Sequence, residues 1–111
     1  MRRSVLTILM VVWAVTSRAE MAVSQKELEQ RGEALLATSC VGCHALGNTG
    51  SSRHPDAPRF RTLAQRGLLD SLRRALIEGR RAPGPPGQHE FTFKADEVSA
   101  IMTYLRSIQT P

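Results

Sequence analysis

The chain of 111 residues has little of what several protein classes require. A transmembrane helix needs about 20 apolar residues, whereas the apolar run of this sequence extends only from Val5 to Val15. Two cysteines are too few for a framework of several disulfides. A length of 111 residues excludes a multidomain enzyme. We therefore expect one small domain, which needs an additional stabilising element because a chain this short buries a modest core.

Residues 1–19 are typical of a secretory signal peptide. A basic start at Arg2 and Arg3 precedes the apolar run, and Ala19 ends a stretch with small residues at the positions that a signal peptidase recognises. Cleavage near Ala19 leaves one domain, residues 20–111. We therefore expect an exported, for example periplasmic, protein without a membrane span in the mature chain, although an uncleaved leader acting as an anchor is an alternative.

The positive charge of the precursor belongs partly to this leader. Removal of its three arginines lowers the formal net charge from +5 to +2. Nucleic-acid binding requires a clustered basic face, and the sequence has only local pairs, Arg73-Arg74 and Arg80-Arg81. We interpret these pairs as solvated rather than as a docking patch for an acidic partner, and expect no nucleic-acid partner.

The two cysteines are part of the string Cys40-Val41-Gly42-Cys43-His44, which has the C-x-x-C-H pattern of covalent haem attachment. Two thiols at this spacing add to the two vinyl groups of one haem, and the next imidazole then lies beneath the iron. A thioredoxin-like pair would need a βαβ pattern, and a structural zinc site usually needs four Cys or His ligands. A local disulfide and zinc remain the lesser alternatives to one covalent haem c with its iron.

The rest of the pattern predicts an all-α domain. Apolar spacing favours helices over residues 24–39, 68–78 and 95–108, separated by loops rich in glycine and proline at 45–59 and 80–93. Ser24 to Glu27 has the S-x-x-E pattern of a capping box, and Gly79 is a typical helix stop. The expected apolar stripes contain Leu28, Leu35, Leu36 and the stem of Arg31 in the first helix, Leu68, Leu69, Leu72, Leu76 and Ile77 in the second, and Val98, Ile101, Met102, Leu105 and Ile108 in the third.

On these residues the chain resembles the class I c-type cytochromes, which carry one haem, from about residue 28 to residue 108. The resemblance implies a cytochrome c-like fold with three main helices wrapped around one covalent haem and with long loops. It also implies that Gly32 and Leu36 of the first helix meet Ile101 and Tyr104 of the last. Gly32 would then mark a close crossing of two helices, which its position inside a helix only suggests by itself.

The resemblance also assigns a role to Pro58. A proline after the haem motif commonly offers its carbonyl to the ring N–H of the proximal histidine, and Ala57-Pro58-Arg59-Phe60 fits this pattern. Such a bond would fix the tautomer of His44 and raise its basicity. His54, Arg59 and Arg61 are interpreted as solvated loop residues, with a contact to a haem propionate as the alternative.

The sequence departs from the family at the sixth iron ligand, which is normally a methionine before the last helix. Gln88 occupies that position, His89 follows it, and no methionine lies between Met21 and Met102. We favour His89 as the distal ligand, with Gln88 or an open site next. Met102 falls on the apolar stripe of the last helix, so we expect it in the core.

The resemblance implies an exported electron carrier rather than an enzyme. Its partners would be a redox donor and a redox acceptor that bind transiently. Loss of the methionine ligand should lower the reduction potential. The alternatives are a haem protein with an open iron that binds a small gas or reduces peroxide, and a haem subunit of an exported dehydrogenase.

Overall fold

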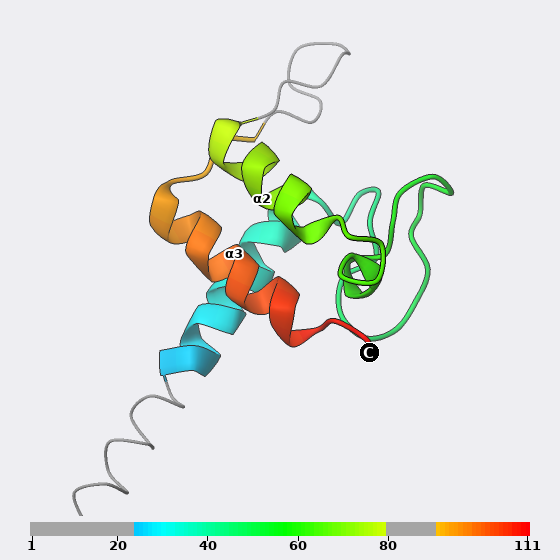
Figure 1. The fold of residues 1–111 in the computed structure, drawn as a ribbon, viewed down its shortest axis with the longest axis horizontal. Helices are drawn as coiled ribbons and strands as arrows, with labels where there is room; N and C mark the ends of the chain where they lie inside the picture. Colours follow the sequence, from blue (N-terminus) through cyan, green and yellow to red (C-terminus); the bar gives the residue numbers. More distant parts are fainter. Residues whose placement is uncertain (1–23, 80–90) are drawn as a thin grey trace, which may run out of the picture.

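The computed structural model describes residues 24–79 and 91–111, and this part of the chain is helical (Figure 1). An N-terminal helix includes residues 24–39. A short 3-10 helix η1 (Phe60–Thr62), α2 (Leu69–Glu78) and α3 (Ala95–Ser107) follow. Within these residues the only β-type assignment is an isolated bridge at Phe91. The prediction of an all-α fold is confirmed.

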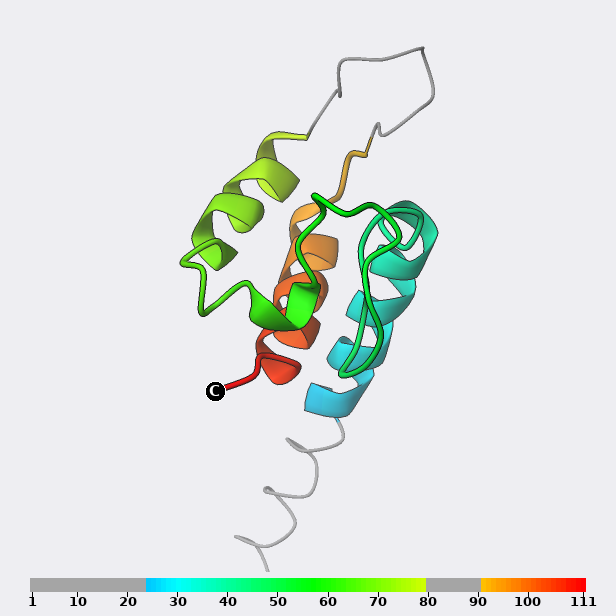
Figure 2. The same ribbon diagram turned by 90° about the vertical axis from the view of Figure 1, so that its right-hand side faces the viewer.

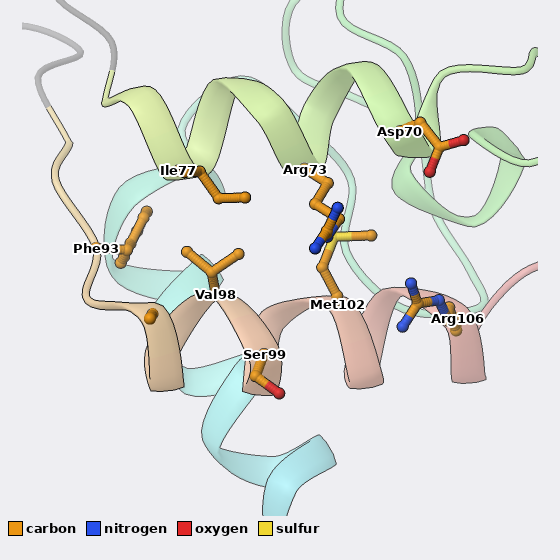
Figure 3. Close-up of a pocket in the computed structure, with 9 residues that line it drawn as sticks. Asp70, Arg73, Ile77, Phe93, Val98, Ser99, Met102 and Arg106 are labelled. Carbon is orange, nitrogen blue, oxygen red and sulfur yellow. The ribbon is translucent and has the colours of Figure 1, made fainter.

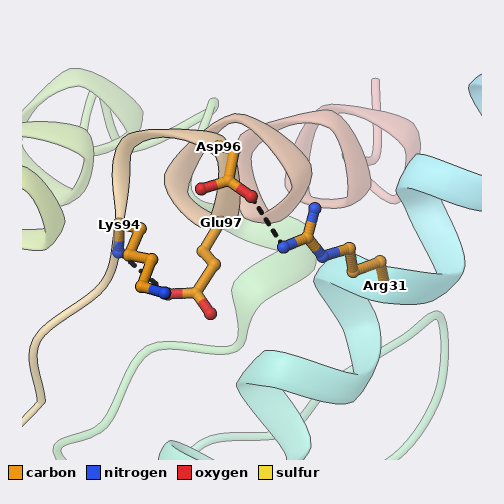
Figure 4. A network of polar contacts seen from close by, with 4 residues as sticks. All are labelled: Arg31, Lys94, Asp96 and Glu97. Atoms are coloured by element: carbon orange, nitrogen blue, oxygen red, sulfur yellow. Dashed lines mark hydrogen bonds and ion pairs between the residues drawn. The ribbon is translucent and has the colours of Figure 1, made fainter.

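The helix ends agree closely with the sequence pattern, with one exception. α2 begins one residue later than predicted, and Gly79 follows it with φ of 70°, a left-handed conformation that glycine adopts readily. At the start of α3 the Glu97 carboxylate accepts the Lys94 backbone N–H at 2.8 Å (Figure 4). The prediction that Ser24 begins a capping box is wrong, because Ser24 already lies within the helix.

The N-terminal helix and α2 both lie beside α3, the last helix of the chain. Figure 2 shows α2 and the N-terminal helix on opposite sides of α3, with the chain between them passing across the front. At the crossing of the N-terminal helix with α3, a side chain on Gly32 would come within 2.6 Å of the Ala100 carbonyl carbon and 2.9 Å of Tyr104 Cβ. The expected close approach at Gly32 is therefore confirmed, and only glycine fits there.

The buried residues match the predicted apolar stripes most closely in α3, where all five of the expected side chains are buried. Two stripe members are instead exposed. Ile77 is 55% exposed on the outer face of α2, and the Arg31 side chain extends from the N-terminal helix to form a 2.7 Å ion pair with Asp96 (Figure 4). The core consists of Leu36, Phe60, Leu63, Leu76, Val98, Ile101, Met102, Tyr104, Leu105 and Ile108.

Candidate haem-attachment site

The C-x-x-C-H motif lies on one additional turn at the end of the N-terminal helix. The Cys40 N–H donates to the Leu36 carbonyl at 2.8 Å, and the His44 N–H donates to the Cys40 carbonyl at 3.0 Å. The second bond joins residues four apart, as in a helix, so Cys40 and His44 share one face of the turn. Both thiols are free, so the alternative of a local disulfide is not adopted here.

The imidazole of His44 is fixed by a hydrogen bond from its ring. His44 Nδ1 lies 2.7 Å from the Pro58 carbonyl oxygen. A carbonyl can only accept a hydrogen bond, so the proton of the neutral ring resides on Nδ1 and Nε2 is left with a free lone pair. The contact that the resemblance implied is thus present, and it leaves Nε2 as the nitrogen able to bind a metal.

Phe60 restrains the same ring from a second direction. The Phe60 and His44 rings are stacked, with centroids 4.6 Å apart and planes inclined by 24°. Phe60 is almost completely buried, and its backbone N–H donates to the Ala45 carbonyl at 3.1 Å. The sequence pattern included Phe60 only as a neighbour of Pro58 and did not predict its stacking on His44. Spacing along the chain does not reveal which way a loop side chain points.

An apolar cavity of about 320 Å³ opens beside this ring. Cys40 and His44 line it, and so do Leu72, Ala75 and Leu76 of α2. Cys43 is not among the residues that line the cavity. The remaining lining residues are Leu36, Pro58, Phe60, Leu63, Leu68, Ser71 and Phe91.

The loop between the motif and η1 is held by polar contacts to its own backbone. The Ser52 hydroxyl accepts the Ala45 N–H at 3.1 Å. Arg61 donates to the carbonyls of Thr49 at 3.1 Å and Gly50 at 2.8 Å. Among the described residues no buried side-chain nitrogen or oxygen lacks a partner. The long loop is therefore ordered by defined contacts, and Arg61 has a structural role in addition to the surface role that we expected.

Two groups beside the core have raised pKa values. Burial, with a smaller contribution from the neighbouring Cys43, raises the pKa of the Cys40 thiol, which favours its neutral form. Burial, followed by the nearby Glu33 carboxylate, raises the pKa of the Tyr104 phenol. An apolar environment that disfavours charge is suited to a large, mostly apolar group.

A second and larger hollow lies on the other face of α2. This groove of about 530 Å³ runs between α2 and α3. Figure 3 shows Met102 and Arg73 in its middle, with Asp70 and Arg106 toward one end and Ile77 and Phe93 toward the other. Met102 is buried, lines this groove and is absent from the lining of the cavity beside His44. The expectation of Met102 as a core residue is confirmed.

The remaining predicted site residues divide into two groups. His89 and Gln88, the candidates for the sixth ligand, lie outside the described residues. His54 is exposed in the loop, where its Nδ1 accepts the Asp56 N–H at 3.3 Å, and Arg59 is also exposed. Within residues 24–79 and 91–111 no three His, Cys, Asp or Glu side chains gather to hold a bare metal ion.

Two free thiols three residues apart, followed by an imidazole with one nitrogen unengaged, are the groups that covalent haem attachment requires, and Cys40 and His44 line an apolar cavity. The family model for cytochrome c matches residues 29–109, and the chain belongs to this family. Searches of curated proteins and of solved structures each found no match.

Membership assigns the cofactor and the general role. Proteins of this family bind covalent haem c with its iron, and Cys40 and Cys43 fit the attachment site. The chain is a c-type cytochrome with a haem-based role in electron transfer. As a redox carrier it exchanges electrons with redox partners. No helix in the described ranges is long and apolar enough to cross a membrane.

Proposed function

We propose that this chain is a class I c-type cytochrome with one haem that carries single electrons outside the cytoplasm and is not an enzyme. The observation that carries the proposal is the His44 ring, held by the Pro58 carbonyl at the wall of an apolar cavity next to Cys40. A ring fixed in this way suits a permanent ligand better than a group that must move during catalysis.

The described residues supply attachment, one ligand and a water-poor surrounding. Cys40 and Cys43 would form the thioether links, His44 Nε2 would bind the iron, and the Pro58 carbonyl would keep the proton on Nδ1. The bound haem supplies reversible one-electron exchange between ferric and ferrous iron. Leu72, Ala75 and Leu76 cover the cavity with apolar atoms, and burial of this kind tunes the potential of a haem.

For the sixth position we propose His89, with Gln88 as the alternative. Met102 is a poor candidate because it lines the outer groove. With nitrogen or amide oxygen in place of a thioether sulfur, the reduction potential should lie below that of a His/Met relative with a similarly buried haem. A redox titration that gives an equally high value would contradict this ligand assignment.

The leader and location belong to the same proposal. Residues 1–19 would be removed near Ala19, leaving residues 20–111 as the mature domain in the periplasm or another exported location. Haem c attachment outside the cytoplasm agrees with this route. The mass of the holoprotein isolated from an exporting host tests it, since retention of Met1 to Ala19 would indicate an anchor instead.

The absorption spectrum of the ferrous holoprotein before and after carbon monoxide tests the function. An unchanged spectrum is expected, because two firm protein ligands leave no position for the gas. A rapid change to a carbonyl spectrum would favour a gas-binding or peroxide-reducing protein. Co-purification with a stable partner would favour a dehydrogenase subunit.

Three variants separate the ligand candidates. His89→Ala should keep the haem attached and alter the low-spin spectrum, whereas Met102→Leu, a matched change in the core, should leave the spectrum unchanged. An unchanged spectrum in His89→Ala would discard His89 as the ligand. Independently of that result, Gln88→Met should raise the reduction potential, because it restores a thioether at the usual family position.

A further inference from the structure

Gln109, which follows α3, connects the end of that helix to the segment beside the haem site. Its Nε2 donates to the carbonyls of Phe60 at 2.8 Å and Leu105 at 2.6 Å. Its Oε1 accepts the Ala64 N–H at 2.8 Å. A primary amide has two N–H donors, and both are used. Because carbonyls need a donor and the N–H needs an acceptor, the three partners allow only one orientation of the amide.

The segment that Gln109 holds carries both contacts to His44. Pro58 accepts from the imidazole, and Phe60 stacks on it. On the other side of Phe60, its backbone N–H is bonded to Ala45, the residue after His44. The Phe60 peptide groups are therefore fixed from two directions, by Ala45 through the N–H and by Gln109 through the carbonyl.

We propose that Gln109 is a positioning residue for the proximal histidine and acts through Phe60 and Pro58. The inference rests on the proposed function, in which His44 Nε2 binds the haem iron. Gln109 fixes the distance between the segment 58–60 and the His44 imidazole. The Pro58 carbonyl stays in line with Nδ1, and the Phe60 ring limits rotation of the imidazole. The first effect is electronic as well as structural, because the bond from Nδ1 to the Pro58 carbonyl raises the basicity of the ligand.

The chain contains a matched control for this role. Gln65 also ties the end of the chain to the region after η1, with Nε2 donating to the Pro111 carbonyl at 2.7 Å. It makes no hydrogen bond to Phe60, Pro58 or His44 among the described residues. Removal of Gln65 loosens the same chain terminus without releasing the segment over the ring.

The test compares Gln109→Leu and Gln65→Leu with the wild-type holoprotein. The two readouts are the reduction potential and the spread of the haem methyl signals in the NMR spectrum of the ferric protein, which reports the orientation of the axial imidazole. Gln109→Leu should raise the potential, since a weaker bond to Nδ1 makes the ligand less electron-rich, and should change the methyl spread. Gln65→Leu should leave both at their wild-type values.

Equal potentials and methyl spreads in Gln109→Leu and wild type would overturn the inference, and so would equal changes in both variants. If Gln109→Leu fails to fold, Phe60→Leu keeps an apolar side chain while removing the stacked ring. It should change the methyl spread, and an unchanged spread would overturn the inference equally. A wild-type holoprotein without a reversible one-electron step would instead overturn the proposed function, so the two failures are distinct.

Discussion

Two of the hollows formed by the described residues lie on opposite faces of α2 and differ in chemistry more than in size. The outer groove is the larger, about 530 Å³ against about 320 Å³, and contains charged side chains such as Asp70, Arg73 and Arg106. The inner cavity is lined almost entirely by apolar side chains, with a thiol and an imidazole at its edge. The comparison teaches that the volume of a hollow does not identify the site of a haem protein. The combination of attachment chemistry and apolar lining does.

The strongest test of this comparison is Cys40→Ala, with Cys43→Ala as its partner. Loss of either thiol removes one of the two covalent links, so we expect the yield of stable covalent holoprotein to fall sharply or to vanish. Haem staining of denatured protein and the pyridine haemochrome spectrum measure the attachment. A normal yield with unchanged spectra would contradict the assignment of the inner cavity as the haem site.

The next largest effect is expected from Gly32→Ala, which should lower the unfolding free energy. This variant tests whether the inner cavity depends on the crossing of the N-terminal helix with α3. The new methyl group would meet the Ala100 backbone, which cannot move aside as a flexible side chain would. We expect a loss of about 3 kcal/mol or more in unfolding free energy, measured by denaturant unfolding of the holoprotein. Gly42→Ala is the control, since a methyl group there meets open space. Equal stabilities of the two variants would refute the tight crossing.

Neighbouring residues on α2 allow a direct comparison of the two hollows. Leu76 is 1% exposed and lines the inner cavity, whereas Ile77 is 55% exposed and lines the outer groove. Leu76→Ala should cost about 2–5 kcal/mol of unfolding free energy. Ile77→Ala should cost less than about 1 kcal/mol, since it loses mostly exposed surface. Similar losses in thermal or denaturant unfolding would mean that the outer groove is filled in solution.

The smallest expected effect belongs to Asp96→Asn, at the ion pair outside both hollows. The hydrogen bond from Arg31 is the main cause that lowers the pKa of the Asp96 carboxyl below its usual range. A lowered folded-state pKa stabilises the protein above the unfolded-state pKa, and this stabilisation disappears as the pH falls through the folded-state value. Because both side chains are exposed, the effect at neutral pH should be slight and should weaken with added salt.

Unfolding curves of wild type and Asp96→Asn between neutral pH and about pH 3 measure this effect, with the reference pKa of Asp near 3.9 marking the centre of the window. Asp56→Asn removes the same charge in an exposed loop and serves as the control. A difference between wild type and Asp96→Asn that grows on acidification would reverse the predicted sign.

Helical periodicity was sufficient to predict α2 and α3 to within one residue, because apolar spacing and Gly79 mark both their extent and their ends. The same periodicity misplaced Ile77 and Arg31. Periodicity identifies the face of a helix that packs against the core, but it does not indicate how many of the residues at the edge of that face become buried. The Gly32 crossing came from the family resemblance, and the structure provides the physical reason, which is contact with the Ala100 backbone.

The residues of the site also fall into those that a local pattern predicts and those that it does not. Short motifs revealed Cys40, Cys43 and His44 because the chemistry of attachment requires a fixed local spacing. Phe60 and Gln109 were missed because their contacts join segments far apart in the chain, and no local pattern encodes which glutamine meets which carbonyl. The sixth ligand remains a prediction, since Gln88 and His89 lie outside the described residues.

The position of Gln109 in the chain also has a consequence for the order of biosynthesis. The attachment motif emerges from the ribosome well before Gln109, the residue that binds the Phe60 carbonyl. During that interval neither α3 nor the amide of Gln109 is available to close the segment over the imidazole. The thiols of Cys40 and Cys43 therefore stay accessible during this interval, and the proximal side becomes rigid only after α3 has been synthesised and has folded against it.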